Sequence, residues 1–314
     1  MNDRNITLIT YHYVRPVRGS TFPMLKALEL KDFESQLEYL SRTYQFVSAE
    51  TVMALFNGQP VDLPPKPALL TFDDGYADHF RYVFPRLFDR KIKAAFYPTV
   101  TAAIDRQILD ANRVHFVLAS TTDPGPLIEL IEHDVDLARR SYQLRTVDQY
   151  RAEFMTPSRF DEPRVAYVKR MLQFALPEGL RRKIADAAFR RFVTQDPSGF
   201  AEELYMGAEE LRTLRASGMH IGLHGTTHGW LGKMSRPEQA SEIKGSLRIL
   251  ELIGQPAKGF SFCFPYGSYN SDTIALLKEF GCSMALTNRS AVAQSTDSKF
   301  ELPRLDTTEL PRAG

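Results

Sequence analysis

Two adjacent aspartates end an apolar run near the start of the chain. The run "ALLTFDDG", residues 68–75, places Asp73 and Asp74 directly before Gly75. Neighbouring carboxylates repel each other and are costly to desolvate, so their position after apolar residues calls for a cause. Such a run is typical of a buried strand, and functional residues of α/β folds collect at the carboxyl ends of strands. We therefore expect a site here that uses two acids.

A pair of histidines stands at the end of a second strand-like run. In "IGLHGTTHGWL", residues 221–231, His224 and His228 are four positions apart. They can converge on one metal ion if the residues between them turn helically, and a carboxylate from elsewhere would then complete a three-ligand set. Alone, this spacing also fits ordinary surface or core histidines. Together with two aspartates at a strand end, it favours a metal site.

A third segment is "FCFPYGSYN" at residues 262–270. Taken alone it indicates a strand that ends in a Pro-Tyr-Gly turn. Its interest lies in its place after the other two motifs.

The elements that would position these residues alternate between strands and helices. Residues 33–44 and 243–253 have helical spacing of apolar side chains, and Ser235 with Glu238 forms a capping-box pair. Seven strands separated by helices predict a parallel sheet in an α/β fold. We expect the strands at 5–14, 68–72, 93–100, 220–224, 259–266, 283–288 and 299–306.

Residues 105–205 differ from the rest of the chain. They contain helical segments interrupted by prolines and no convincing strand. This stretch is expected to be a helical insertion that caps the metal cleft and shapes the substrate pocket.

Composition limits the class of protein. The chain has 314 residues, 43% of them hydrophobic, which is enough for a full core. Its 39 Lys and Arg against 38 Asp and Glu argue against a nucleic-acid binder that relies on bulk charge. Two cysteines are too few for a disulfide scaffold. The first residues lack a signal-peptide pattern and no apolar run is long enough to span a membrane, so a cytoplasmic protein is expected.

The three motifs in this order resemble those of the polysaccharide deacetylase, or NodB-homology, family of carbohydrate esterases. T-F-D-D-G, H-G-T-T-H and F-P-Y-G carry the resemblance, which covers residues 1–104 and roughly 206–306. Gly225 stands where the family usually has Ser or Thr. The resemblance implies a distorted (β/α) barrel of about seven parallel strands, formed by 1–104 and 206–314, with 105–205 as a helical insertion or cap.

The resemblance also implies roles for individual residues. Asp74, His224 and His228 would bind one divalent metal ion, zinc first, with nickel, cobalt, iron or manganese as alternatives. Asp73 would accept a proton from the metal-bound water, and the backbone N–H of Tyr266 would face the oxyanion. The cation would offset the repulsion between the aspartates, so that Asp73 remains a base near neutral pH.

The chain departs from the family pattern in two places. Many members carry an arginine where this chain has Cys263, and Arg304 in "ELPRLD" is the candidate to pair with Asp73 instead; the alternative is a structural or surface arginine. The usual late histidine is also missing. His12 in "TYHYV" resembles an N-terminal Y-H of a branch that acts on partly acetylated glucosamine polymers, which implies a general acid; the alternative is a core histidine.

The function implied is metal-dependent removal of an N-acyl group, N-acetyl first, from an amino sugar. In the cytoplasm the substrate would be a nucleotide-linked or lipid-linked precursor of a surface polysaccharide. Hydrolysis of a non-sugar amide or an O-acetyl ester is the alternative with the same chemistry, and a catalytically silent carbohydrate-binding protein is the alternative of another class. Eight Lys and Arg within residues 164–191 indicate either recognition of a phosphate or anionic membrane surface, or a solvated helix face.

Overall fold

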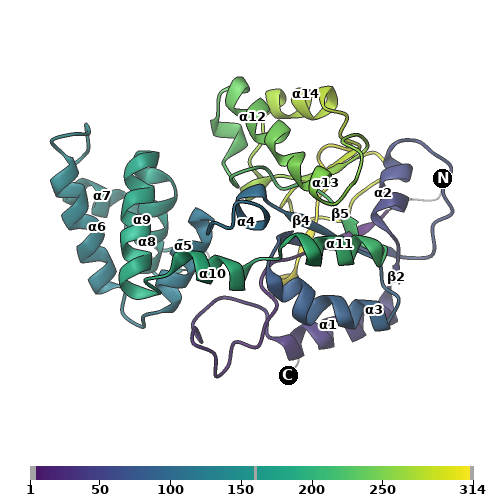
Figure 1. The fold of residues 1–314 in the computed structure, drawn as a ribbon, viewed down its shortest axis with the longest axis horizontal. Coiled ribbons are helices and arrows are strands. Elements are labelled where there is room, and N and C mark those ends of the chain that lie inside the picture. Colours follow the sequence, from purple (N-terminus) through teal and green to yellow (C-terminus); the bar gives the residue numbers. More distant parts are fainter. Residues whose placement is uncertain (1–4, 159–160, 312–314) are drawn as a thin grey trace. The chain divides into compact units, whose positions relative to one another are not determined.

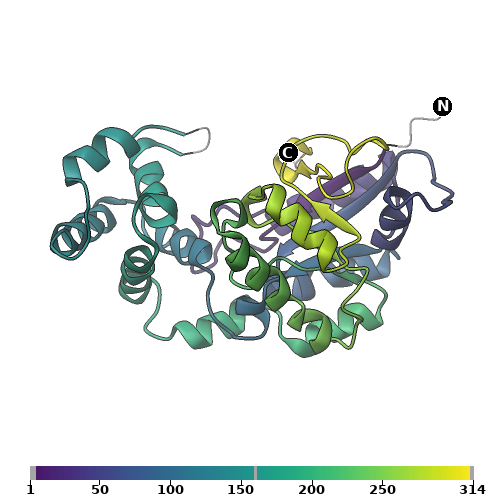
Figure 2. The same cartoon turned by 90° about the horizontal axis from the view of Figure 1, so that it is seen from above.

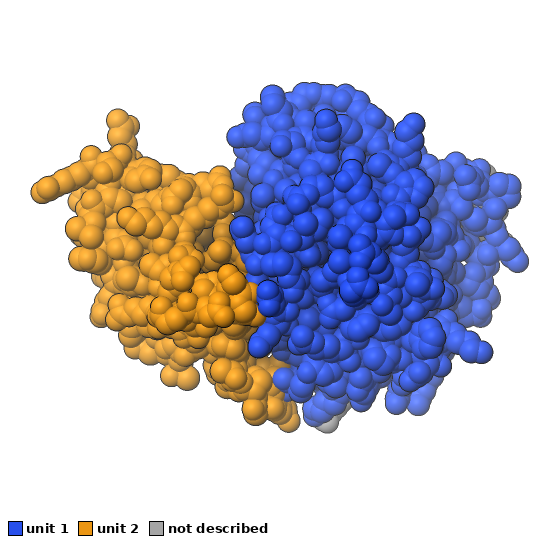
Figure 3. Space-filling model, viewed as in Figure 1, with its two compact units in different colours: residues 1–16, 27–107, 201–314 blue, residues 17–26, 108–200 orange. Residues whose placement is uncertain are grey.

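The computed structural model describes residues 5–158 and 161–311. The chain forms two compact units, coloured blue and orange in Figure 3. Unit 1 consists of residues 1–16, 27–107 and 201–314, and unit 2 of residues 17–26 and 108–200. The first four and last three residues of the predicted barrel, and two residues of the predicted insertion, lie outside the described part of the chain.

Unit 1 contains the strands that were predicted and one more. They are β1 (Thr7–Tyr11), β2 (Gln45–Phe46), β3 (Pro67–Asp74), β4 (Ala94–Pro98), β5 (His220–Ile221), β6 (Ser261–Cys263), β7 (Met284–Leu286) and β8 (Leu305–Asp306). The first sheet has the order β5-β4-β3-β1-β8, with β2 beside β3, and β6 pairs with β7. Every ladder is parallel.

Two single bridges link the sheets into a ring. Leu223 pairs with Phe262 after β5, and Leu286 of β7 pairs with Leu302 just before β8. Because these links are single bridges rather than ladders, the ring is a distorted (β/α) barrel, and the predicted fold class is confirmed. The last predicted strand is shorter than expected, since only its final two residues continue as β8.

Helices cover the outside of the barrel. They are α1 (Leu30–Thr43), α2 (Ala49–Phe56), α3 (Phe84–Asp89), α4 (Val100–Ala103), α11 (Ala208–Ala216), α12 (Arg236–Ser246), α13 (Arg248–Leu252) and α14 (Ser271–Glu279). In Figure 1, α12, α13 and α14 lie above the strands, and α1, α3 and α11 lie below them. The single periodic helix expected over 243–253 is divided into α12 and α13. Gly245 is a weak helix former, and the Ser246 hydroxyl donates to the Ile243 carbonyl, which together favour a break there.

Alternation along the strands creates two apolar layers. Leu8, Leu69 and Leu302 face the barrel interior, which α2 closes at one end with Val52. The side chains that alternate with these along the strands face outward. Among them, Tyr11, Phe72 and Phe96 stack in a row across β1, β3 and β4, with ring centroids 5.0 Å apart in each adjacent pair. Figure 2 shows these strands running side by side inside the helical layer. By this alternation, Thr10, Thr71 and Asp73 face inward.

Unit 2 is helical, and its described residues contain no strand. It holds α5 (Asp110–Ala119), α6 (Gly125–Ala138), α7 (Val147–Phe154), α8 (Pro163–Arg170), a π-helical turn (Met171–Ala175) and α9 (Glu178–Phe192), while α10 (Pro197–Leu204) contains the boundary between the units. Phe22 and Phe116 pack edge to face, as do Phe189 and Phe200.

Acidic neighbours pair with half of the basic run in unit 2. Arg164, Lys169, Arg182 and Arg190 each form an ion pair with an aspartate of the same unit. These pairs offset part of the positive charge that an anion-binding surface would need, and they favour the interpretation as a solvated helix face.

Candidate metal centre

The two adjacent aspartates leave β3 in different directions. Asp73 keeps the strand conformation and faces the barrel interior, where 2% of its surface is exposed. Asp74 has a φ of 70°, in the left-handed region that aspartate tolerates better than most residues. Gly75 follows with a φ of 76°, and a Cβ there would lie 2.8 Å from the Cβ of Pro98. The chain therefore turns sharply, and the two carboxylates acquire separate surroundings.

Asp74 meets both histidines of the second motif. Its Oδ1 lies 3.4 Å from Nε2 of His224 and 3.2 Å from Nε2 of His228. One divalent ion with bonds of about 2.1 Å to each atom would space its ligands by about this much. Asp74 Oδ1 is buried and has no hydrogen-bond partner among the described residues. The three residues therefore fit a facial two-histidine, one-carboxylate site for a divalent ion.

Further hydrogen bonds orient two of these ligands, His224 and Asp74. Nδ1 of His224 donates to the backbone carbonyl of Cys263 at 2.8 Å, so Nε2 is the ring nitrogen that faces Asp74 and is available to an ion. The Tyr76 hydroxyl donates to Oδ2 of Asp74 at 2.7 Å, so Oδ1 is the oxygen left for a cation. Tyr76 is itself stacked on Tyr13, with ring centroids 4.1 Å apart.

The two histidines converge through a non-helical turn. Gly225 has a φ of 78° and His228 a φ of 62°, both left-handed. This conformation accounts for glycine at the position where the family usually has Ser or Thr. Glu242 of α12 holds the turn, because its carboxylate accepts from the backbone N–H groups of Thr226 and Thr227 at 3.1 and 3.0 Å.

Asp73 is paired with a buried arginine. Arg304 donates from Nη1 to Oδ1 of Asp73 at 2.9 Å and from Nη2 to Oδ2 at 2.7 Å. Both side chains are 3% exposed. The Thr10 hydroxyl also donates to Oδ2 at 3.2 Å. Arg304 thus lies where the sequence analysis placed a substitute for the family arginine, and it is buried rather than at the surface.

Burial and charge act in opposite directions on both carboxylates. Burial alone raises the pKa of Asp73, but the charge and hydrogen bonds of Arg304 outweigh it and hold that pKa well below its usual range. For Asp74, burial again raises the pKa, and His228 and His224 lower it further than burial raises it. Burial also lowers the pKa of His228, which favours the neutral imidazole that a metal ion requires. For His224, burial lowers the pKa but Asp74 and its other neighbours raise it further, so a metal ion would displace a proton from that imidazole. Both carboxylates are therefore ionised at neutral pH.

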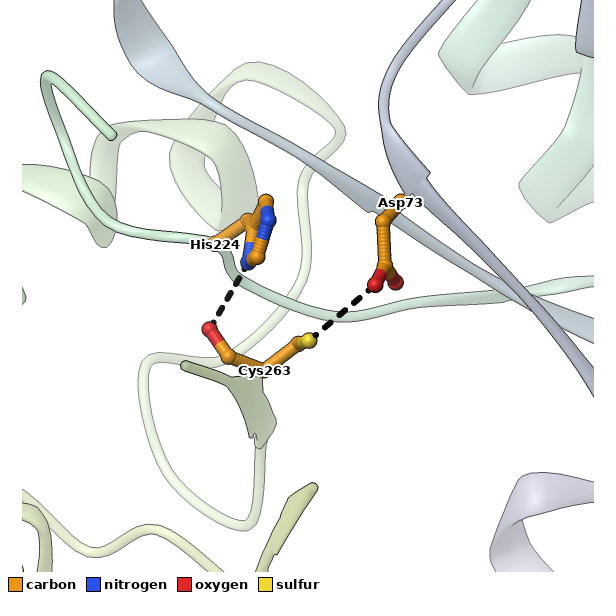
Figure 4. A group of neighbouring side chains, drawn as sticks. All are labelled: Asp73, His224 and Cys263. Atoms are coloured by element: carbon orange, nitrogen blue, oxygen red, sulfur yellow. Dashed lines mark hydrogen bonds between the residues drawn. The ribbon is translucent and has the colours of Figure 1, made fainter. Parts of the chain in front are cut away.

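A second group of potential ligands adjoins the first. Asp73, His224 and Cys263 also lie close enough together to share an ion (Figure 4). Burial raises the pKa of the Cys263 thiol, which therefore remains protonated and donates to Oδ2 of Asp73 at 3.4 Å. Nη2 of Arg304 lies 3.0 Å from the same sulfur. A cation there would face the guanidinium, so the set with Asp74 is the better metal site.

His12 lies at the rim of this cluster, one residue after β1. Its Nε2 is 4.0 Å from Oδ2 of Asp73, and its side chain is 49% exposed, so it is not a core histidine. Nε2 of His79 donates to the His12 backbone carbonyl at 2.7 Å. Burial lowers the pKa of His79 to about 4, so at neutral pH this imidazole is an uncharged donor that fixes the backbone of His12.

Tyr266 sits in a 3-10 turn (Pro265–Gly267) after β6. Its φ of 57° is left-handed. Its carbonyl accepts from Nδ2 of Asn288 at 3.1 Å, and its ring packs edge to face on His228 with centroids 4.5 Å apart. Asp74, His228 and Tyr266, one from each motif, are three of the six described non-glycine residues with a positive φ. Strained backbone is thus concentrated at this site, as it is at many functional sites.

Part of the chain matches a known protein family. A sequence profile described as polysaccharide deacetylase matches residues 182–285, which include His224, His228 and Tyr266 but neither aspartate. The resemblance to this family is confirmed. No curated protein matches the chain significantly.

Several solved structures share the fold at low sequence identity. The chain is similar to the Streptococcus pyogenes deacetylase PplD in complex with acetate, with 16% identity, a TM-score of 0.58, and coverage of 97% of this chain and 93% of that one. It is similar to IcaB from Ammonifex degensii, with 19% identity, a TM-score of 0.56 and coverage of 97% and 92%. A de-N-acetylase from Aggregatibacter actinomycetemcomitans gives 17% identity, a TM-score of 0.54 and coverage of 96% and 95%.

The structure brings together all seven residues singled out in the sequence and adds others. Tyr76, Cys263 and Glu242 contact the candidate ligands or their turn and were not assigned a role. The sequence offered a hint for Glu242, because it is an acidic residue directly before the buried Ile243 on the same helix. For the other two, only the folded arrangement shows the contact.

Removing the predicted ligands tests the metal site. The purified protein should contain about one divalent ion per chain, and His224→Ala should lose most of it. His133→Ala, in an exposed part of α6, is the matched control and should retain the ion. Elemental analysis of the dialysed proteins gives the result. Stoichiometric metal in a His224→Ala, His228→Ala double variant would contradict the assignment.

Removing one hydroxyl tests the orientation of Asp74. Tyr76→Phe should weaken zinc affinity by about 10-fold to 100-fold, because Oδ2 of Asp74 loses its donor. Tyr11→Phe is the control: the Tyr11 hydroxyl is also buried but has no hydrogen-bond partner among the described residues. Competition with a chromophoric chelator measures both affinities. Equal zinc affinity in the two variants would show that the Tyr76 contact is unimportant.

Proposed function

We propose that the chain is a metal-dependent hydrolase that removes an N-acyl group, N-acetyl first, from an amino sugar. The observation that carries the proposal is that the two adjacent carboxylates have different partners. Asp74 faces two imidazoles that fit a cation, and Asp73 faces Arg304 at hydrogen-bond distance. This arrangement supports attack by water on an acyl carbonyl, with one acid to hold the ion and the other to take a proton.

Each residue then has a defined task. A divalent ion in the site would polarise the acyl carbonyl and lower the pKa of water beside it, with zinc the first candidate. Asp73 is the base that takes a proton from the attacking water. Arg304 keeps that carboxylate ionised and fixes both of its oxygens, because its two nitrogens donate to them in a bidentate pair.

The negative charge that develops on the acyl carbonyl oxygen needs a hydrogen-bond donor. Ser268 donates its backbone N–H to the Pro265 carbonyl at 2.9 Å, which holds the Pro265–Tyr266 peptide plane in one orientation. Because the bond is trans, the N–H of Tyr266 points opposite to that carbonyl. We assign this N–H to the oxyanion.

The leaving nitrogen needs a proton, because an amine anion is a poor leaving group. His12 is the candidate donor, since its exposed imidazole lies at the rim of the cluster 4.0 Å from Asp73. At this distance the two side chains are near enough to reach the same bound substrate.

The substrate is proposed only as a class. Support for an N-acetylated sugar comes from the family profile and from the similarity to a deacetylase and a de-N-acetylase. A nucleotide-linked or lipid-linked precursor and a cytoplasmic setting stay predictions. No described helix is long and apolar enough to cross a membrane.

Acetate release from oligomers of N-acetylglucosamine tests the function. The zinc-loaded wild type should release acetate, and Asp73→Asn should lower turnover by about two to four orders of magnitude while metal content stays the same. Loss of metal together with activity would mean that the roles of the two aspartates are exchanged. Bound metal without acetate release from any acetylated sugar, amide or ester would favour a carbohydrate-binding protein instead.

Two substrates with different leaving groups test His12. His12→Ala should damage hydrolysis of an amide far more than hydrolysis of an acetyl ester with an acidic alcohol, because that alcohol leaves unprotonated. Kinetics on both substrates, with metal content as the check on folding, give the comparison. A parallel fall on the two substrates would remove His12 from the mechanism.

A further inference from the structure

The ring of Tyr266 is held between two aromatic side chains. Its face stacks on Trp230, with centroids 4.2 Å apart and planes inclined by 5°. The His228 ring also contacts it, edge to face, with centroids 4.5 Å apart. Trp230 follows His228 by two residues, so one loop supplies both neighbours of the tyrosine.

Trp230 is itself anchored. Leu231, the next residue, is fully buried in the layer outside the barrel. The ammonium group of Lys233 lies 4.6 Å from the centre of the Trp230 ring, in a cation–π contact. With a cation and a tyrosine ring against it, the indole is part of a packed stack.

The stack bears on a strained residue. A left-handed conformation is strained for a non-glycine residue and persists only where the surroundings enforce it. At Tyr266 the contacts that enforce it include the backbone hydrogen bond from Ser268 to Pro265, the Trp230 ring and the hydrogen bond from Asn288 to the Tyr266 carbonyl. The stabilisation from an aromatic stack of this kind is of the same order as that strain.

We infer that Trp230 is a positioning residue that holds Tyr266 in the left-handed conformation and thereby aims its backbone N–H at the reacting carbonyl. The inference rests on the proposed function, because that function gives the N–H its task. Because the Tyr266 ring contacts both His228 and Trp230, an ion bound at His228 should also change the surroundings of Trp230 through the Tyr266 ring.

Kinetics of two variants at position 230 test the role. Trp230→Leu should lower kcat and kcat/KM on N-acetylglucosamine oligomers together, by about 10-fold to 100-fold, because an oxyanion donor acts mainly in the transition state. Metal content should not change. Trp230→Phe, which can still stack, should recover most of the loss.

A neighbouring stack provides the matched control. Tyr269 stacks on Phe264 with centroids 4.5 Å apart, three residues beyond Tyr266, and no described ring contact joins it to Tyr266. Tyr269→Leu should therefore keep kcat close to that of the wild type. A wild-type kcat in Trp230→Leu, or an equal fall in Tyr269→Leu, would overturn the inference while leaving the proposed function in place.

A second readout does not depend on activity. Trp230 is the only tryptophan of the chain, so its fluorescence reports this stack alone. Adding zinc to the metal-free protein should change the emission, and Tyr266→Ala should abolish the change while still binding zinc. Unchanged emission in a wild type that binds zinc would overturn the inference. If the wild type releases no acetate, the proposed function fails, and this titration decides the coupling separately.

Discussion

The buried pairing of Asp73 with Arg304 is the interaction on which the rest of the site depends. Removing a carboxylate from water costs several kcal/mol unless a partner compensates it, and a second carboxylate on the next residue adds repulsion. Arg304 supplies the compensation for Asp73 through two hydrogen bonds. Asp74 instead faces two imidazoles, with one buried oxygen that lacks a donor among the described residues. The two adjacent acids are tolerated because each carboxylate has its own positive partner. For Asp73 that partner is Arg304, and for Asp74 it would be a cation held together with the two histidines.

The backbone makes this division possible. A strand alone would point Asp73 and Asp74 to opposite faces of the sheet. The left-handed conformation of Asp74 instead turns its carboxylate toward the loop after β5, where His228 is left-handed as well. Hydrogen bonds from Tyr76 and to Glu242 hold the two turns, so rigidity at the strand ends fixes the ligands before any ion arrives.

The sequence predicted the strands and the candidate site residues better than it predicted the residues that hold them in place. Apolar runs located the parallel strands, because strands buried on both faces have a near-continuous apolar pattern. The motif residues are distinctive in type and order, and they meet because the carboxyl ends of the strands share one end of the barrel. β2, with two residues, is too short for periodicity to show, and the association of residues 17–26 with unit 2 depends on long-range packing. Likewise Cys263, Tyr76 and Trp230 have ordinary local sequence patterns, and their contacts exist only between elements far apart in the chain.

The central claim is that a divalent ion binds Asp74, His224 and His228 and leaves Asp73 and Cys263 to Arg304. X-ray absorption at the zinc edge of the zinc-loaded protein measures the atoms around the ion directly. The account predicts a first shell of nitrogen and oxygen at about 2.0–2.2 Å, with imidazole scattering and no sulfur. A sulfur neighbour at about 2.3 Å would contradict it, because Cys263 would then be a ligand and Asp73 would have lost its role as a base.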